Sequence, residues 1–469
     1  MKKQILNLIV LFLFWGCLYV ISTKVWGILK FNHHYYLKAF YATAFFVSLG
    51  YKSLWSLGPD LNKTKKLKYL SSLLLLFAFL TYSSLMFDRA RGLYTFLVSE
   101  EGPGRTGAYH QADDEIGHTQ IPNSRAFRTF TMGPSVPVVC DQDGFRVPLT
   151  DTLKVNTPND VDILFLGCSF TYGDACHADS IFAHLVGEEL EFKYINAGVC
   201  AYGLSEMMVV ANKLIPKYKP KYTIIQHSPW IVPRAMELYG PAYYGSLPHA
   251  YFSKTESGSY QVNAPIFKSQ IFDLDPIAIR KKYNDRFVKF TWDVIIPFYL
   301  KEDFYYAKTL ADLHLLKKIS PPANNVEGVK NYAYDSLIDL ATKNGSTPII
   351  LKIGFSDHSP DTGWKNSLST IVDSDAWLME YLKSSETHEY AREFHHWHNT
   401  GAELIKIDHH PNTKAHAIIA KSIVDVIQNG TNHIKHVKHV NQLFQNKKED
   451  KNIDRFIYGY TKMSTEWVR

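Results

Sequence analysis

The chain has 469 residues, a net charge of +6, and a composition that is 46% hydrophobic and 20% charged. This composition excludes an intrinsically disordered protein, and the length allows a large core and more than one domain. A nucleic-acid partner is not expected, because the lysines of residues 63–68 fit a membrane topology and the lysines of residues 435–451 are typical of a solvated tail.

Three apolar segments near the N-terminus, at residues 5–22, 36–57 and 69–86, are candidate transmembrane helices. The alternatives are a signal peptide for the first segment and two inserted spans in place of three. The positive-inside rule places the lysines of residues 63–68 in the cytoplasm. With three spans, everything after about residue 90 emerges on the outer, periplasmic face. The sequence therefore predicts a multi-pass membrane protein whose residues 1–95 use the lipid bilayer as a partner.

Residues 96–159 are predicted to form a linker and short strands. Gly and polar residues dominate residues 99–107, which are typical of a linker. The segments DDEIGHTQIPN (residues 113–123) and DQDGFRVP (residues 141–148) contain turn-forming residues between short strand-like runs. Asp143-Gly144 is a turn signal within the second segment.

Strand-like and helix-like segments alternate over residues 160–430 and predict an α/β fold: a three-layer, doubly wound parallel sheet. Ligands of such sheets bind at the carboxyl ends of the strands. Residues 231–325 break the alternation and are rich in Tyr and Phe, which indicates an insertion that covers the active site or lines the substrate site. Residues 431–469 form a polar basic tail. The expected strands are residues 161–167, 192–198, 222–228, 347–354 and 403–407, and the expected helices are residues 180–190, 204–218, 332–343 and 414–427.

A candidate nucleophile, Ser169, directly follows the first of these strands, in the sequence GCSFT. A Ser hydroxyl needs a base to become nucleophilic, and His410 in the sequence DHHPN is the best candidate. Asp408 lies two residues before His410 and can orient its imidazole. The residues therefore predict a Ser169–His410–Asp408 triad at the carboxyl edge of the sheet.

Three short blocks resemble the SGNH (GDSL-like) hydrolase superfamily. GCSFT, with Ser169, is similar to the block that carries the nucleophile, and residues 408–412, with His416, are similar to the block that carries the Asp and His. Asn196-Ala197-Gly198 is similar to the second block, whose Gly donates a backbone N–H to the oxyanion hole. The resemblance implies an SGNH hydrolase-like fold, a serine ester hydrolase, and oxyanion donors at Ser169 and Gly198.

The chain departs from the SGNH pattern in the third block and beside the nucleophile. Cys168 occupies a position where the family has Asp. The family's third block supplies an Asn side chain to the oxyanion hole, whereas this chain reads QHSPW over residues 226–230. Gln226, His227 or Ser228 could substitute for that Asn. Loss of one such donor costs on the order of 100-fold or more in rate, which leaves weak or absent hydrolysis open.

No cofactor and no metal site is expected. The chain has no CxxC pair, and the histidines of residues 395–398 are more typical of a solvated loop than of a metal site. The four cysteines that follow the predicted anchor, in the presumed outer part of the chain, could pair as disulfides or remain free thiols. They are Cys140, Cys168, Cys176 and Cys200.

These expectations combine into a membrane-anchored serine esterase that removes an O-acyl group, most simply acetyl, from an envelope glycan or another envelope ester. Two alternatives stay open at this point. The same site could transfer the acyl group to a sugar hydroxyl, with a membrane acyltransferase as a partner, or the domain could bind glycans without catalysis.

Overall fold

The computed structural model describes residues 104–106, 110–129, 135–149, 159–242, 245–266, 281–283, 286–295, 320, 322–354, 370–383 and 386–430. All of them belong to the second of two units, Tyr94–Arg469. The predicted anchor (residues 1–95) and tail (residues 431–469) lie outside the described residues. Within the described ranges, no helix has the length and apolar character needed to cross a membrane.

A five-stranded parallel sheet forms the centre of this unit, with the strand order β14-β13-β8-β6-β7. Four of its strands lie within the predicted runs, so the α/β prediction is confirmed. Every residue of β6 is at most 1% exposed, as expected for a parallel strand that is covered on both faces. The strands are β6 (Ile163–Leu166), β7 (Tyr194–Asn196), β8 (Tyr222–His227), β13 (Thr347–Lys352) and β14 (Thr370–Asp373).

The strand order creates a topological switch point between β6 and β8. After β6 the chain adds β7 on one side, and then crosses to the other side of β6 to add β8. The helix after β6, α5 (Phe182–Leu190), and the helix after β8, α12 (Val326–Lys343), lie on opposite faces of the sheet, so the carboxyl ends of β6 and β8 are where an open α/β sheet has its ligand crevice. Ligands of open α/β sheets bind in this crevice.

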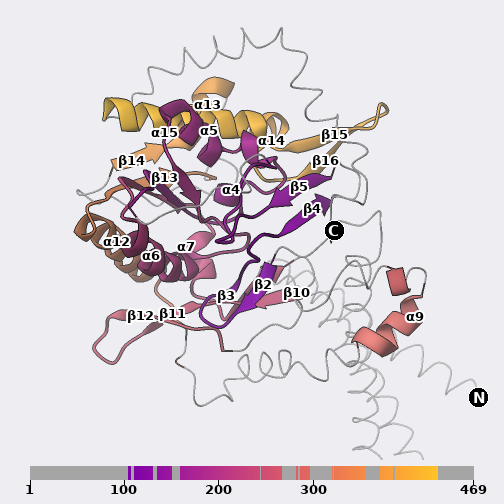
Figure 1. Cartoon of the computed structure of the whole chain (residues 1–469), viewed down its shortest axis with the longest axis horizontal. Helices are drawn as coiled ribbons and strands as arrows, with labels where there is room; N and C mark the ends of the chain where they lie inside the picture. Colours follow the sequence, from indigo (N-terminus) through magenta and orange to yellow (C-terminus); the bar gives the residue numbers. More distant parts are fainter. Residues whose placement is uncertain are drawn as a thin grey trace, which may run out of the picture. The chain divides into compact units, whose positions relative to one another are not determined.

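Helices cover both faces of the sheet (Figure 1). On one face α6 packs against α12, and on the other α15 packs against α5 and α13. The sequence predicted the bounds of α6 correctly. It placed the start of α12 too late, because Asn325 caps this helix by accepting a hydrogen bond from Gly328 N at 3.0 Å. The helices are α5 (Phe182–Leu190), α6 (Leu204–Tyr218), α12 (Val326–Lys343), α13 (Ser374–Leu382) and α15 (Thr413–Asn429).

Short antiparallel strands precede the central sheet. They form a hairpin of β2 and β3 and a three-stranded sheet with the order β1-β4-β5. β1 lies inside the segment predicted to be a linker, and its pairing with β4 corrects that prediction for these residues. The strands are β1 (Gly104–Thr106), β2 (His110–Asp113), β3 (Gly117–Gln120), β4 (Arg125–Thr129) and β5 (Val136–Val139).

The predicted insertion, residues 231–325, contains two antiparallel hairpins, β9 with β10 and β11 with β12. None of its described strands joins the parallel sheet. Its described elements are α7 (Ile231–Arg234), β9 (Tyr239–Ala242), β10 (Gly245–Pro248), β11 (Tyr251–Lys254), β12 (Tyr260–Asn263), α9 (Phe287–Phe290) and the π-helical turn η4 (Thr291–Ile295).

The strand predicted over residues 403–407 does not join the parallel sheet. β16 (Leu404–Asp408) pairs with β15 (His396–Asn399) as a separate antiparallel ribbon that follows α14 (Thr387–Phe394). The physical reason lies in burial, since Leu404 is 50% exposed and no residue of β16 is fully buried. A strand with polar residues and exposed faces does not suit the interior of a parallel sheet.

Candidate active site

A tight strand-to-helix turn presents Ser169 at the switch point. β6 leads into Gly167, and α4 (Ser169–Tyr172) begins with the serine itself. A Cβ on Gly167 would lie 2.1 Å from Thr171 Oγ1 and 2.5 Å from Gln226 Oε1, so only glycine fits there. Ser169 is 7% exposed, and its hydroxyl lies 3.9 Å from Cys168 Sγ.

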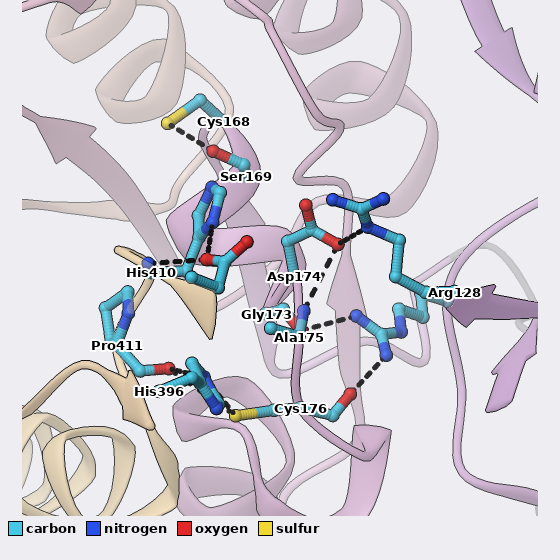
Figure 2. Close-up of polar contacts among 12 residues, drawn as sticks. Arg128, Cys168, Ser169, Gly173, Asp174, Ala175, Cys176, His396, His410 and Pro411 are labelled. Carbon is cyan, nitrogen blue, oxygen red and sulfur yellow. Dashed lines mark hydrogen bonds and ion pairs between the residues drawn. The ribbon is translucent and has the colours of Figure 1, made fainter. Parts of the chain in front are cut away.

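The loop between β16 and α15 brings His410 to the same place. Asp408 Oδ1 accepts hydrogen bonds from His410 Nδ1 at 2.5 Å and from His410 N at 2.7 Å. Figure 2 shows the imidazole of His410 directed toward the hydroxyl of Ser169. Since Nδ1 is held by the aspartate, the nitrogen on the Ser169 side of the ring is Nε2, the atom that would take the hydroxyl proton.

Asp408 and His410 each shift the pKa of the other toward its charged form. Burial by itself would lower the pKa of His410, but the charge and hydrogen bond of Asp408 raise the net pKa above the usual histidine value. Burial would raise the pKa of Asp408, whereas the charge and hydrogen bonds of His410 hold it well below its usual range. The aspartate therefore stays ionised and can stabilise an imidazolium during a reaction.

The loop that carries His410 is fixed by its neighbours. Asn412 caps α15 by accepting a hydrogen bond from Ala415 N at 3.0 Å, and its amide donates to Glu393 O at 2.8 Å. Pro411 O accepts a hydrogen bond from His396 Nε2 at 3.0 Å (Figure 2). These contacts hold the histidine block against α14 and β15.

Four of the five residues predicted to form the oxyanion hole have other hydrogen-bond partners in this structure, namely Gly198, Gln226, His227 and Ser228. Gly198 N donates to Asn196 Oδ1 at 3.0 Å. Gln226 Nε2 donates to Ser228 Oγ at 2.8 Å and to Cys168 Sγ at 3.2 Å, while its Oε1 accepts from Cys168 N at 3.0 Å. His227 Nδ1 lies 2.9 Å from the hydroxyl of Tyr334.

Gln226 thus has a structural role, since it ties the end of β8 to the turn that carries Ser169. Ser228 Oγ donates to Ile353 O at 2.7 Å and continues this tie to the end of β13. The oxyanion role predicted for Ser169, Gly198, Gln226, His227 or Ser228 stays a prediction.

Two contacts beside Ser169 were not predicted from the sequence. Trp230 follows β8, and its indole Nε1 donates to Cys168 Sγ at 3.3 Å. The loop after β7 is tied to the same turn, because Val199 N donates to Gly167 O at 3.3 Å. Neither contact has a signal in the local sequence.

A buried guanidinium supports the far end of α4. Arg146 is 1% exposed and donates to the carbonyl oxygens of Tyr172 at 3.0 Å, Gly173 at 2.6 Å and Cys176 at 2.5 Å. Figure 2 shows the Gly173 and Cys176 ends of these contacts below the serine. A positive charge at the carboxyl end of a helix complements the helix dipole and its open carbonyls.

Metal ligation at this site would compete with the pair already described. In the described part of the chain, the three residues whose ligand atoms lie within 4.8 Å of one another are Asp408, His409 and His410. Asp408 Oδ1 is already engaged by two hydrogen bonds from His410.

The disulfide alternative is decided in favour of free thiols for the described cysteines, which are Cys140, Cys168, Cys176 and Cys200.

Comparisons with known proteins add little. No family model matches the chain. No curated protein matches it. A solved structure of a protein assigned to the G-D-S-L lipolytic family, from Desulfitobacterium hafniense DCB-2, matches with a TM-score of 0.26 and 10% identity. The match covers 57% of this chain and 99% of the other. At this TM-score it carries no argument about function.

Proposed function

We propose that the chain is a serine ester hydrolase with Ser169 as nucleophile, His410 as general base and Asp408 as the residue that orients the base. The observation that carries the proposal is the doubly bonded Asp408–His410 pair whose free ring edge faces the Ser169 hydroxyl at the switch point of the sheet. The support is that Asp408 fixes the imidazole of His410 and that the other edge of the ring is directed toward the Ser169 hydroxyl, which is the order of nucleophile, base and orienting group that serine hydrolysis uses.

The reaction follows from this arrangement. His410 Nε2 takes the hydroxyl proton as Ser169 Oγ bonds to the ester carbonyl carbon, and the carbonyl π electrons move to oxygen as an oxyanion. Collapse of the tetrahedral centre breaks the bond to the leaving alcohol, which receives the proton from the imidazolium. Water then attacks the acyl-serine by the same steps in reverse order and releases the carboxylic acid.

The proposed substrate is an O-acyl group, most simply O-acetyl, on an envelope glycan or a similar envelope ester. The support comes from the apolar segments of residues 1–95 and the lysines of residues 63–68, which favour a bilayer anchor with the catalytic unit on the outer face. The half-buried Trp230 adds an aromatic side chain beside Ser169 and packs on the buried ring of Phe170, with ring centroids 4.8 Å apart. Aromatic faces suit both sugar rings and short acyl groups.

Replacement of Ser169 by alanine tests the proposal. Ser169→Ala should remove hydrolysis of p-nitrophenyl acetate and covalent labelling by a fluorophosphonate, because both reactions need the hydroxyl oxygen. Ser180→Ala, on the 3₁₀ turn η2 (Ala178–Ser180), is the matched control and should keep wild-type rates.

Equal activity of Ser169→Ala and wild type would overturn the assignment, and absence of both activities in the wild type would favour a glycan-binding domain. Transfer of the acyl group to an added glycan, faster than its hydrolysis, would favour an O-acyltransferase.

A further inference from the structure

The third block of the site places near the nucleophile an N–H donor that was not among the predicted oxyanion groups. Gln226 and Ser228 bond to each other and brace the sheet ends. Gln226 Nε2 also donates to Cys168 Sγ, but Gln226 is tied to Ser228 and to Cys168 N as well. Trp230 lies beyond the end of β8 and directs its single indole N–H at the same sulfur, which lies 3.9 Å from Ser169 Oγ. We propose that the indole N–H of Trp230 stabilises the oxyanion, in the role that an Asn side chain has in SGNH hydrolases. This inference rests on the proposed esterase function.

The present partner of this N–H is easily exchanged. A thiol sulfur is a weak hydrogen-bond acceptor. An oxyanion is a charged acceptor, and hydrogen bonds to charged oxygens are roughly twice as strong as neutral ones. The oxyanion is only two bonds from Ser169 Oγ, so it forms on the nucleophile that adjoins this thiol. The indole N–H therefore gains a stronger acceptor when the oxyanion forms beside the sulfur in the transition state.

The indole is also held in place before the reaction. Its ring packs edge-on against Phe170, with centroids 4.8 Å apart and planes at 62°. On another side, Gly354 has a φ of +91°, and a Cβ there would lie 2.5 Å from Trp230 Cη2. A donor fixed in advance costs little reorganisation when charge develops, which is how oxyanion holes act.

Trp230→Phe is the direct test, because it keeps an aromatic ring and removes the N–H. We expect kcat for p-nitrophenyl acetate to fall by roughly 100-fold with little change in KM, since the lost bond exists only in the transition state. Trp397→Phe is the matched control. It removes an indole N–H that donates to Ala391 O at 2.9 Å, and it should leave kcat within about twofold of wild type because that bond lies outside the oxyanion site.

The double variant with Cys168→Ala separates catalysis from support of the thiol. If Trp230 served only to hold Cys168, the effect of Trp230→Phe would vanish in the Cys168→Ala background. A loss of similar size in both backgrounds supports the oxyanion role. If Trp230→Phe fails to fold, β-(3-benzothienyl)alanine at position 230 replaces only the N–H by sulfur, and the same loss of kcat is expected.

The results for Ser169→Ala distinguish the two proposals. Wild-type kcat in a folded Trp230→Phe protein, with Ser169→Ala inactive, overturns the oxyanion role and leaves the esterase standing. Full activity of Ser169→Ala overturns both.

Discussion

At the scale of single residues, Asp408 and His410 determine how the proposed activity depends on pH. The base acts only when its imidazole is neutral, and Asp408 raises the pKa of His410 above the usual histidine value. Activity should therefore be low below this raised pKa and increase as pH rises through it. Measurement of kcat/KM against pH should give one ionisation on the acidic limb, at a pH above about 6.5.

Asp408→Asn should both slow the enzyme and move this limb. The amide carries no charge, so it no longer raises the pKa of His410, and the acidic limb should shift to lower pH. It also no longer fixes the tautomer, which in serine triads lowers kcat by about 10⁴-fold. Asp179→Asn, at an exposed aspartate that accepts a hydrogen bond from Ser180, is the control. A variant with wild-type rate and profile would remove Asp408 from the mechanism.

The sequence was most informative about this site where the signal is local. Asp408 and His410 lie two residues apart in one loop, so their pairing could be predicted from spacing. The third block could not be predicted in this way. Which side chain of residues 226–230 faces Ser169 depends on how β8 packs beside β6 and where Gly354 leaves room for the indole of Trp230.

At the scale of elements, the turn before the sheet controls the position of α4. Asp141 Oδ1 accepts from Asp143 N at 3.0 Å and from Phe145 N at 2.8 Å, and Gly144 completes the turn with a φ of 86°. This turn, which the Asp143-Gly144 pair predicted, brings Arg146 to the three carbonyl oxygens at the end of α4 and just beyond it. A segment outside the parallel sheet thus supports the helix that carries Ser169.

Arg146→Ala should lower the free energy of unfolding by at least about 3 kcal/mol, because three buried carbonyl oxygens lose a charged donor. Arg146→Lys should recover only part of this loss, since an ammonium cannot reproduce the planar fork. Urea denaturation measures both variants. Arg125→Ala, at an exposed position on β4, should change the free energy by less than about 0.5 kcal/mol. Equal stabilities of Arg146→Ala and wild type would contradict this role.

Other elements show why parts of the fold were readable and others were not. β6 is a buried apolar run, β8 has a short apolar centre at Ile224 and Ile225, and α6 has an apolar face, so their patterns identified them. β14 has the sequence TIVD with one fully buried residue, which is too short and too polar for a distinct signal. β16 was recognised as a strand, but its pairing with β15 depends on contacts that periodicity does not encode.

At the scale of the whole molecule, buried histidines link folding to pH. His118 is 1% exposed and donates from Nε2 to Cys200 O at 2.9 Å, between the β2–β3 hairpin and the loop after β7. The pKa of His118 is lowered to about 4, chiefly by burial. The hydrogen bond to Cys200 O raises this pKa, the charge of His249 lowers it further, and the charges of Glu206 and Asp113 raise it. Folding therefore keeps this imidazole neutral where the unfolded chain would protonate it.

The sign of the stability change follows from proton uptake. Between pH 6.5 and about 4 the unfolded chain binds more protons at His118 than the folded chain, so stability falls as pH drops through this window. A shift of this size corresponds to roughly 3 kcal/mol. His118→Asn should reduce the pH dependence of the free energy of unfolding, measured by urea denaturation from pH 7 to 4.5, whatever its effect at pH 7. His388→Asn, at a side chain that is 76% exposed, should leave the slope unchanged. An unchanged slope in His118→Asn would show that other groups, such as the fully buried His416, account for the acid sensitivity.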